Sequence, residues 1–321
     1  MTGPRAVPTN RHFRLESLAP GVYATIARPR GYALCNSGIV DLGGATVVFD
    51  SMLTPMAAQL LARTATRLTG RPPDWVVNSH WHGDHIWGNS AFSGAHVVST
   101  HRTRREIRRR SRAQLVECRR EFPRELRALS RPGSTVPRRE RPGLRGWFEG
   151  VLAMPRSHRI VLPDVTFVDE LVLEGSRRAL HLLSYGGGHS PSDVLGYLPD
   201  ERIVLAGDLT MVGMHPSVSD GWTDRWIHIL ERIDRLRPDR ILPGHGVPGT
   251  RRDLAIEIRY LGELDRIVAR ARREGRSLAD LRKTPIPSAY SEWTFSVMFP
   301  DNLSRVYRLA RRAGAGPGRG R

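Results

Sequence analysis

Short apolar runs, separated by glycine, proline and polar residues, dominate the first hundred positions of the chain. They are five to eleven residues long and rich in Val, Ile and Ala, and they predict strands. The runs lie at 23–28, 32–42, 45–50, 74–79 and 96–100. Before the fourth run, Thr54 and Pro55 are typical of a helix N-terminus, and the pattern predicts a helix over 55–68 that ends before Gly70.

The pattern changes over residues 101–155, where arginine is interspersed with apolar residues. We predict an arginine-rich helical insertion there, interrupted by proline and glycine at 131–146. Strand-like runs then resume and lead into the last helices. The later segments are strands at 166–175, 178–190, 192–200 and 201–208, a helix at 223–237, a short strand at 239–244 and helices from about residue 250.

Strands followed by a helix thus occur twice, which predicts an α/β fold of two similar β-rich halves with helices outside. We expect one main domain. The predicted division is a loose tail at 1–11, a domain over 12–250 that carries the insertion at about 101–155, C-terminal helices at 251–312 packed on that domain, and a flexible tail at 313–321.

Composition bounds the class of protein. The 321 residues, 40% of them hydrophobic, are enough for a large core. No segment approaches the roughly 18 apolar residues that a membrane-spanning helix needs. The first residues lack the apolar centre of a secretory signal, and only two cysteines are present. We therefore expect a cytoplasmic protein without a disulfide framework and without a membrane partner.

The net charge of +18 is of the kind found in nucleic-acid-binding proteins. However, 49 of the 50 basic residues are arginine and only Lys283 is lysine, a ratio that codon bias can produce. Residues 101–150 hold 16 arginines against 6 glutamates. More than half of the net charge therefore lies in the predicted insertion, and nucleic acid is not the favoured partner.

The segment NSHWHGDHIWGN places three histidines and an aspartate within six positions. It follows an apolar run, so we expect these residues at a strand end or in the turn beyond it. In a strand the residues i and i+2 share a side, so His80 and His82 can reach one metal ion together. Asp84 and His85 follow a glycine, which permits a sharp turn toward a second position. Nitrogen and oxygen donors without thiolate suit zinc, iron or manganese.

Three more residues complete the pattern. His189 ends a glycine-rich turn, Asp208 follows the apolar run RIVLA, and His245 lies in the segment PGHG. Each comes directly after a predicted strand, and ligands collect where the strands of such a sheet end. We therefore expect all of these side chains at one rim.

These motifs, in this order, resemble those of the metallo-β-lactamase-fold hydrolases over about residues 20–250. The resemblance implies a four-layer αββα sandwich. Asp50, which ends VVFD, matches the family's first motif, a carboxylate that supports the ligands. The resemblance also implies two metal ions: His80, His82 and His189 bind one, Asp84, His85 and His245 bind the other, and Asp208 bridges them.

The implied chemistry is hydrolytic. Two zinc ions lower the pKa of a shared water, provide hydroxide at neutral pH and polarise the scissile carbonyl or phosphoryl oxygen. Asp84 orients the nucleophile or passes a proton to the leaving group. Zinc is favoured because hydrolysis needs no redox chemistry, and iron or manganese stays open with the same ligands.

The fold hosts many reactions, so it does not name the substrate. The PGHG segment is similar to the small-molecule branch of glyoxalase II and the lactonases, which implies cleavage of an ester, thioester or lactone. The β-lactamases of the family lack an aspartate at the position of Asp208. RNA-processing nucleases share HxHGDH, but the 37 positions from Asp208 to His245 leave no room for their inserted domain. Both stay as less favoured alternatives.

A further alternative comes from the zinc-dependent cyclases and thioesterases of aromatic polyketide pathways, a subset of the family. The insertion lies where this fold places loops over the active site, and its arginines would recruit an acidic acyl carrier protein or an anionic substrate. The simpler interpretation is a solvated helical hairpin that only covers the sheet. The apolar residues expected to roof the pocket are Leu115, Val116, Phe122, Trp147, Phe148 and Leu152.

Two further side chains are candidates for catalysis. His215 lies shortly after Asp208 and can face the cavity, or it can be a loop histidine bonded to backbone. Tyr185 precedes the glycine-rich turn and can donate to an oxyanion, or it can pack as a strand tyrosine. The C-terminal helices form either an oligomer surface or the outer layer of the sandwich.

Overall fold

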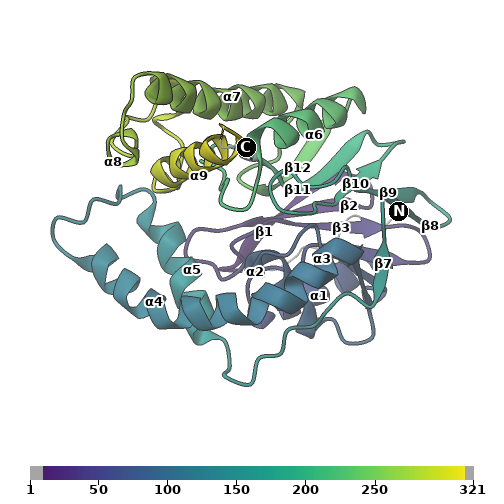
Figure 1. Cartoon of the computed structure of the whole chain (residues 1–321). Helices are drawn as coiled ribbons and strands as arrows, with labels where there is room; N and C mark the ends of the chain where they lie inside the picture. Colours follow the sequence, from purple (N-terminus) through teal and green to yellow (C-terminus); the bar gives the residue numbers. More distant parts are fainter. Residues whose placement is uncertain (1–9, 315–321) are drawn as a thin grey trace, which may run out of the picture.

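The computed structural model describes residues 10–314, so most of both predicted tails, 1–11 and 313–321, lies outside the described residues. Two β-sheets form the centre of the molecule (Figure 1). The first has seven strands in chain order: β1 Phe13–Ala19, β2 Val22–Ala27, β3 Ser37–Asp41, β4 Thr46–Phe49, β5 Trp75–Val77, β6 His96–Thr100 and β7 Val165–Phe167. Pairing is antiparallel from β1 to β4 and parallel from β4 to β7.

The second sheet has five strands in the order β12-β11-β10-β9-β8. Only β11 and β12 are parallel, and the other neighbours are antiparallel. The strands are β8 Glu170–Glu174, β9 Ala179–Leu183, β10 Leu195–Leu198, β11 Ile203–Met211 and β12 Arg240–His245. The two sheets therefore belong to the two halves of the chain, as the repeated strand pattern predicted.

Helices cover the outer faces of both sheets (Figure 1). They are α1 Pro55–Thr69, α2 Gly83–Ile86, α3 His101–Glu106, α4 Arg112–Ser130, α5 Arg141–Ala153, α6 Thr223–Arg235, α7 Arg251–Arg273, α8 Leu278–Leu281 and α9 Met298–Gly314. A π-helical turn, Ile107–Ser111, joins α3 to α4, and 3-10 helices occupy Trp87–Ala91 and Ser288–Tyr290. Within residues 10–314, none of the helices has the length and the apolar character to cross a membrane.

Alternating side chains explain the layers. In β4, Val47 and Phe49 pack toward the second sheet, whereas Val48 packs toward α1. On the far side, Trp226 of α6 and Tyr260 of α7 pack with α9 against the second sheet. The order helix, sheet, sheet, helix confirms the predicted αββα sandwich.

The signals at the ends of α1 act as the sequence predicted. The Thr54 side chain accepts a hydrogen bond from the backbone N–H of Ala57, and a proline occupies the first turn. Gly70 adopts the left-handed conformation that ends the helix. Local capping thus fixes both ends of this helix, which positions the loop that begins at Asp50.

The insertion departs from its prediction in one respect. The stretch 131–146 was expected to be broken, but α5 begins at Arg141. Pro142 lies in the first turn, where a helix tolerates proline. Gly146 lets the helix approach another segment closely, since a Cβ there would lie 2.7 Å from the backbone oxygen of Gly31. Glycine has a low helix propensity, but at position 146 it allows close packing, so tertiary contacts outweigh the local preference.

Candidate metal centre

The first sheet delivers four ligand residues where β5 ends. The strand stops at Val77, so His80 and His82 lie in the turn beyond the strand end, one of the two placements that the sequence left open. Ser79 explains the turn, because its backbone N–H and its hydroxyl both donate to the Asp50 carboxylate at 2.8 Å. The last two ligands, Asp84 and His85, lie in α2.

The second sheet delivers the other three. His189 lies in the loop between β9 and β10, and His245 is the last residue of β12. Asp208 was expected after a strand, but β11 continues to Met211, with irregular pairing beside Gly207. The structure therefore brings all seven predicted ligands to one rim, where the two sheets meet.

The donor atoms form two groups. In the first, His82 Nδ1 lies 2.9 Å from His80 Nε2 and 3.0 Å from His189 Nε2. In the second, Asp84 Oδ2 lies 3.2 Å from His245 Nε2 and 3.5 Å from His85 Nε2. Each group gathers its atoms within 4.8 Å, a span that a single metal ion can bridge.

Asp208 lies between the two groups. Its Oδ2 is 3.7 Å from His80 Nε2 and 3.4 Å from His189 Nε2. Its Oδ1 is 3.1 Å from His85 Nε2 and 3.3 Å from His245 Nε2. One carboxylate thus offers one oxygen to each group. Gly244 makes room for it, since a Cβ there would lie only 1.9 Å from Asp208 Oδ1.

Hydrogen bonds orient four of the five histidines. In each ring the nitrogen that faces away from the donor group meets an acceptor, so the other nitrogen keeps a lone pair. The partners are Ser79 Oγ for His80 at 2.9 Å, Asp50 Oδ2 for His85 at 2.8 Å, Leu34 O for His245 at 3.1 Å and Asp220 Oδ2 for His82 at 3.2 Å. The contact of Asp50 with His85 agrees with its predicted supporting role.

Asp220 is a site residue that sequence reasoning missed. Its other oxygen accepts a hydrogen bond of 2.8 Å from Arg110, which comes from the π-helical turn of the insertion. The Arg110 guanidinium also stacks on Trp81, 3.8 Å from the ring centre. Neither residue belongs to a recognisable motif, and 138 positions separate Asp220 from His82, so no local signal marked them.

Charges and burial shift the pKa values of the histidines differently in the two donor groups. Burial lowers the pKa of His189 to about 3, although Asp208 opposes the shift. Burial also lowers the pKa of His245, but the carboxylates of Asp208 and Asp84 outweigh it and raise that pKa to about 10. For Asp208 itself, burial raises the pKa, and His85 and His245 more than reverse this, so the carboxylate stays ionised.

The donor set fits metal ions. Ring nitrogens whose lone pairs point at one another at about 3 Å repel unless a cation lies between them. His85 Nε2 and Asp208 Oδ1 are buried and lie 3.1 Å apart, and neither makes a hydrogen bond to a described residue outside the donor set, a state that a metal ion between them relieves. Nitrogen and carboxylate donors suit zinc, iron or manganese.

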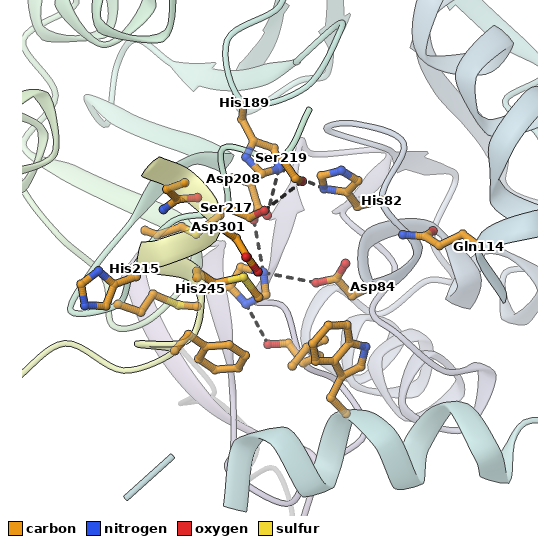
Figure 2. A pocket seen from close by; sticks show the side chains of 17 residues that line it. His82, Asp84, Gln114, His189, Asp208, His215, Ser217, Ser219, His245 and Asp301 are labelled. Carbon is orange, nitrogen blue, oxygen red and sulfur yellow. Dashed lines mark hydrogen bonds and ion pairs between the residues drawn. The ribbon is translucent and has the colours of Figure 1, made fainter. Parts of the chain in front are cut away.

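A cavity of about 330 Å³ opens onto the donor atoms (Figure 2). His82, Asp84, His189, Asp208 and His245 line it from the metal centre. The rest of the lining comes from four other parts of the chain. They are the insertion with Gln114 and Trp147, the loop residue Leu34, the segment 211–219 with Met211, Met214, His215, Ser217 and Ser219, and the segment 295–302 with Phe295, Met298, Asp301 and Asn302.

The insertion therefore does reach the cavity, but only Trp147 of the six predicted roof residues lines it. Leu115, Phe122 and Phe148 pack in the insertion's own core, because α4 and α5 need an apolar interface with each other. Val116 and Leu152 are exposed. Gln114 lines the cavity and was not predicted.

The two other predicted catalytic residues differ in their placement. His215 lines the cavity on the side away from His82, and its ring packs on Tyr260, whose hydroxyl lies 3.0 Å from Nδ1. Burial lowers the pKa of His215 to about 4, so the ring is neutral. Tyr185 does not line the cavity. It packs beneath Arg232, 3.7 Å from the ring centre, in a separate depression, so its predicted oxyanion role has no geometric support.

An αββα sandwich whose rim gathers five histidines and two aspartates defines a metal-dependent hydrolase. A family model described as "Metallo-beta-lactamase superfamily" matches residues 30–245, and the chain belongs to that superfamily.

Solved structures share the fold at low sequence identity. A metallo-beta-lactamase from Pontibacter korlensis is 17% identical with a TM-score of 0.58, and the match covers 78% of this chain and 99% of that one. The enzyme from Hirschia baltica is 17% identical with a TM-score of 0.55 and coverages of 78% and 97%. The enzyme FIM-1 from Pseudomonas aeruginosa, in a mono-zinc form, is 15% identical with a TM-score of 0.56 and coverages of 80% and 97%.

Proposed function

We propose that this chain is a dinuclear zinc hydrolase that cleaves an acyl bond, an ester, thioester or lactone, in a small-molecule or carrier-bound substrate. The observation that carries the proposal is the position of Asp208. Its two oxygens lie 3.1 to 3.7 Å from ring nitrogens of two separate donor groups. A carboxylate shared in this way can bridge a pair of metal ions about 3.5–4 Å apart.

When bound, the two ions supply a water molecule that is ionised near neutral pH and polarise the scissile carbonyl. In the overall reaction, the oxygen of water joins the acyl carbon and the leaving atom takes a proton. Asp84 lines the cavity, and we assign it the role of holding or passing that proton. His215, a neutral ring whose Nδ1 lies 3.0 Å from the Tyr260 hydroxyl, lines the wall on the side away from His82.

The cavity lining supports an apolar acyl group. Its wall is largely hydrophobic, formed by Leu34, Trp147, Met211, Met214, Phe295 and Met298. Among the described residues that line the cavity there is no arginine and no lysine. A substrate whose reacting end is strongly anionic, such as a nucleic-acid backbone, would lack cationic partners other than the metal ions.

The same lining makes a β-lactam a weaker alternative. Such substrates carry a carboxylate close to the scissile bond, and a carboxylate is best bound by a guanidinium or an ammonium group. The structural similarity to β-lactamases does not outweigh this, since one fold hosts many activities.

A carrier-bound substrate, hydrolysed or cyclised as in the polyketide enzymes, is the second candidate. Exposed arginines on α3, the π-helical turn and the start of α4 give the surface of the insertion a positive charge. They are Arg102, Arg105, Arg108, Arg109 and Arg112. An acidic acyl carrier protein is the partner that such a surface would attract.

The test is metal content by elemental analysis of the protein as purified, with activity followed in parallel. The substrates are an aryl ester, a lactone, an acyl thioester, a cephalosporin and a structured RNA. We expect two zinc ions per chain and turnover of at least one acyl bond. One iron per chain without hydrolysis would overturn the mechanism, and turnover of only the cephalosporin or only the RNA would overturn the substrate class.

A further inference from the structure

A second depression adjoins the cavity at the metal centre. Its volume is about 310 Å³, and it shares Ser219 and Asp301 with the lining of that cavity. Figure 2 shows both side chains at the cavity. We call this depression the arginine groove because of its other lining residues: Arg282, Ser304, Arg305, Arg308, Leu309 and Arg312.

Three of its four arginines lack a carboxylate partner within the described residues. Arg282 pairs with Asp301 at 2.6 Å, which neutralises it. Arg305 donates to the backbone oxygen of Gly221 at 3.2 Å but makes no ion pair in the described part of the chain. Arg308 and Arg312 are exposed and likewise unpaired there.

The guanidinium groups also repel one another. Burial lowers the pKa of Arg305, and the neighbouring charges of Arg312 and Arg308 lower it further, with Asp220 opposing the shift. Like charges held close together are unfavourable in the free protein. An anion in the groove would relieve that repulsion, and three unpaired positive charges suit a phosphate or diphosphate better than a single carboxylate.

The groove leads away from the site of the chemistry. Asp301, Arg305, Arg308 and Arg312 follow one face of α9, at helical spacings of four, three and four residues. At 1.5 Å per residue, the arginines extend from about 6 Å to about 16 Å along the helix from Asp301. α9 packs beside α7 in the outer layer (Figure 1). Met298, Asp301 and Asn302 near its start line the cavity, whereas Arg308 and Arg312 farther along the helix are exposed.

We propose that the arginine groove binds a phosphate group on the leaving part of the substrate, which makes the substrate a phosphate-bearing thioester. This rests on the proposed acyl-bond hydrolysis. The apolar cavity holds the acyl group, and Arg305, Arg308 and Arg312 hold the phosphate about 6 to 16 Å along the groove. On hydrolysis the acyl carbon–sulfur bond breaks, the oxygen of water enters the acid product, and the sulfur takes a proton as the free thiol.

The experiment compares thioesters that share one acyl group. The leaving groups are coenzyme A, phosphopantetheine and N-acetylcysteamine, which carry a nucleotide with several phosphates, one phosphate and none. The double variant Arg308→Ala/Arg312→Ala removes two groove charges. The matched control is Arg63→Ala/Arg67→Ala, two exposed arginines with the same four-residue spacing on α1.

We expect the wild-type chain to prefer the coenzyme A thioester over the N-acetylcysteamine thioester in kcat/KM. The groove variant should lower that preference at least about tenfold, mainly through KM, as the loss of charge-assisted hydrogen bonds implies. The control variant should keep the preference. Equal use of the coenzyme A and phosphopantetheine thioesters would identify the single phosphate, as on a carrier protein, and preference for coenzyme A would identify the nucleotide.

A preference that is absent in the wild type, or that both double variants keep equally, overturns the proposal. Binding separates this failure from failure of the proposed function. If no thioester is hydrolysed, titration calorimetry with coenzyme A and with pyrophosphate still tests whether the arginine groove binds a phosphate group. Binding that is weakened in Arg308→Ala/Arg312→Ala, and not in the control, supports it, and no difference between the two variants overturns it.

Discussion

At the scale of single residues, His82 differs from the other ligand histidines. It directs Nδ1 at the donor group, whereas the other four direct Nε2. Its Nε2 is occupied by Asp220, which Arg110 holds in turn. The orientation of this one ligand therefore depends on Arg110 of the insertion. The insertion is thus coupled to the metal centre through Asp220.

This coupling predicts that substitution of Asp220 or Arg110 weakens zinc binding. Asp220→Ala should weaken zinc affinity by roughly 10- to 100-fold, as losing the hydrogen-bond partner of a ligand histidine does. Arg110→Met should have a smaller effect in the same direction, because Asp220 loses its guanidinium partner. Competition with a chromophoric chelator measures the affinity directly, whether or not the enzyme is active.

The adjacent Arg109 provides the matched control. It is exposed and pairs with Glu106 instead of Asp220. Arg109→Met should therefore leave zinc affinity unchanged. Equal weakening in Arg109→Met and Arg110→Met would show that charge in the insertion matters in general, and that the contact with Asp220 does not.

Gly244 predicts a second effect at this scale. A Cβ at this position would lie 1.9 Å from Asp208 Oδ1 and 2.8 Å from the carbonyl carbon of Gly207, so the carboxylate must move. A displacement of about 1 Å at a catalytic centre typically lowers activity by roughly 100-fold. Gly244→Ala should lose metal as measured by elemental analysis, while its far-ultraviolet circular dichroism stays that of the wild type.

Gly262→Ala is the corresponding control, because a Cβ there meets only Arg266 Nη1 at 3.7 Å. It lies inside α7, where alanine favours the helix. It should keep its metal and its activity. Full metal content in Gly244→Ala would mean that Asp208 does not need its observed position.

The sequence pointed to all seven residues that the structure gathers at the rim, but not to their surroundings. Histidine and aspartate at strand ends or in the turn beyond them are a local signal, and these residues gather even though the extra length of β11 was not predicted. Asp220 and Gln114 carry no such signal. Their roles follow from tertiary packing, which brings an insertion and a distant loop to the same cavity.

At the scale of elements, α7 and β11 meet at a buried carboxyl group. Glu257 of α7 is 1% exposed and accepts a hydrogen bond from the backbone N–H of Met211 at 3.2 Å. Burial raises the pKa of Glu257 well above 4.5, which outweighs that hydrogen bond, and Asp208 and Asp253 add to the rise. Burial at this position therefore favours the protonated form of the side chain.

The raised pKa of Glu257 determines how the stability of the fold changes with pH. Above pH 4.5 the unfolded chain loses this proton while the folded chain keeps it, so the folded state binds more protons and its stability falls as pH rises. The slope is about 1.4 kcal/mol per pH unit until the folded pKa is reached. Glu257→Gln should remove this contribution and so gain stability relative to the wild type between pH 5.5 and 7.5.

Denaturant unfolding of both proteins at these two pH values measures the difference. Glu231→Gln, an exposed position on α6, controls for the loss of one negative charge. A stability difference between wild type and Glu257→Gln that is the same at both pH values would contradict a buried, protonated Glu257.

At the scale of the whole molecule, the metal centre connects the two sheets. His80, His82, Asp84 and His85 follow the first sheet, whereas Asp208 and His245 belong to the second. The fold class was predictable because unbroken apolar runs indicate strands that are buried on both faces, as Val47 and Val48 show. The arrangement of the insertion over the cavity was not predictable, because its arginine-rich sequence does not indicate which side chains face the cavity.

Because both sheets supply ligands, metal ions should stabilise the whole fold. Ions that bind only the folded state add roughly 4 kcal/mol to the free energy of unfolding at a free concentration 1,000 times Kd. Removing metal with a chelator should therefore lower Tm by several degrees, and adding zinc should restore it. Calorimetric scans of the native, stripped and reloaded protein measure this. Asp208→Asn, which removes the shared carboxylate, should respond much less, and an unchanged Tm after metal removal from the native protein would show that the two sheets hold together without the ions.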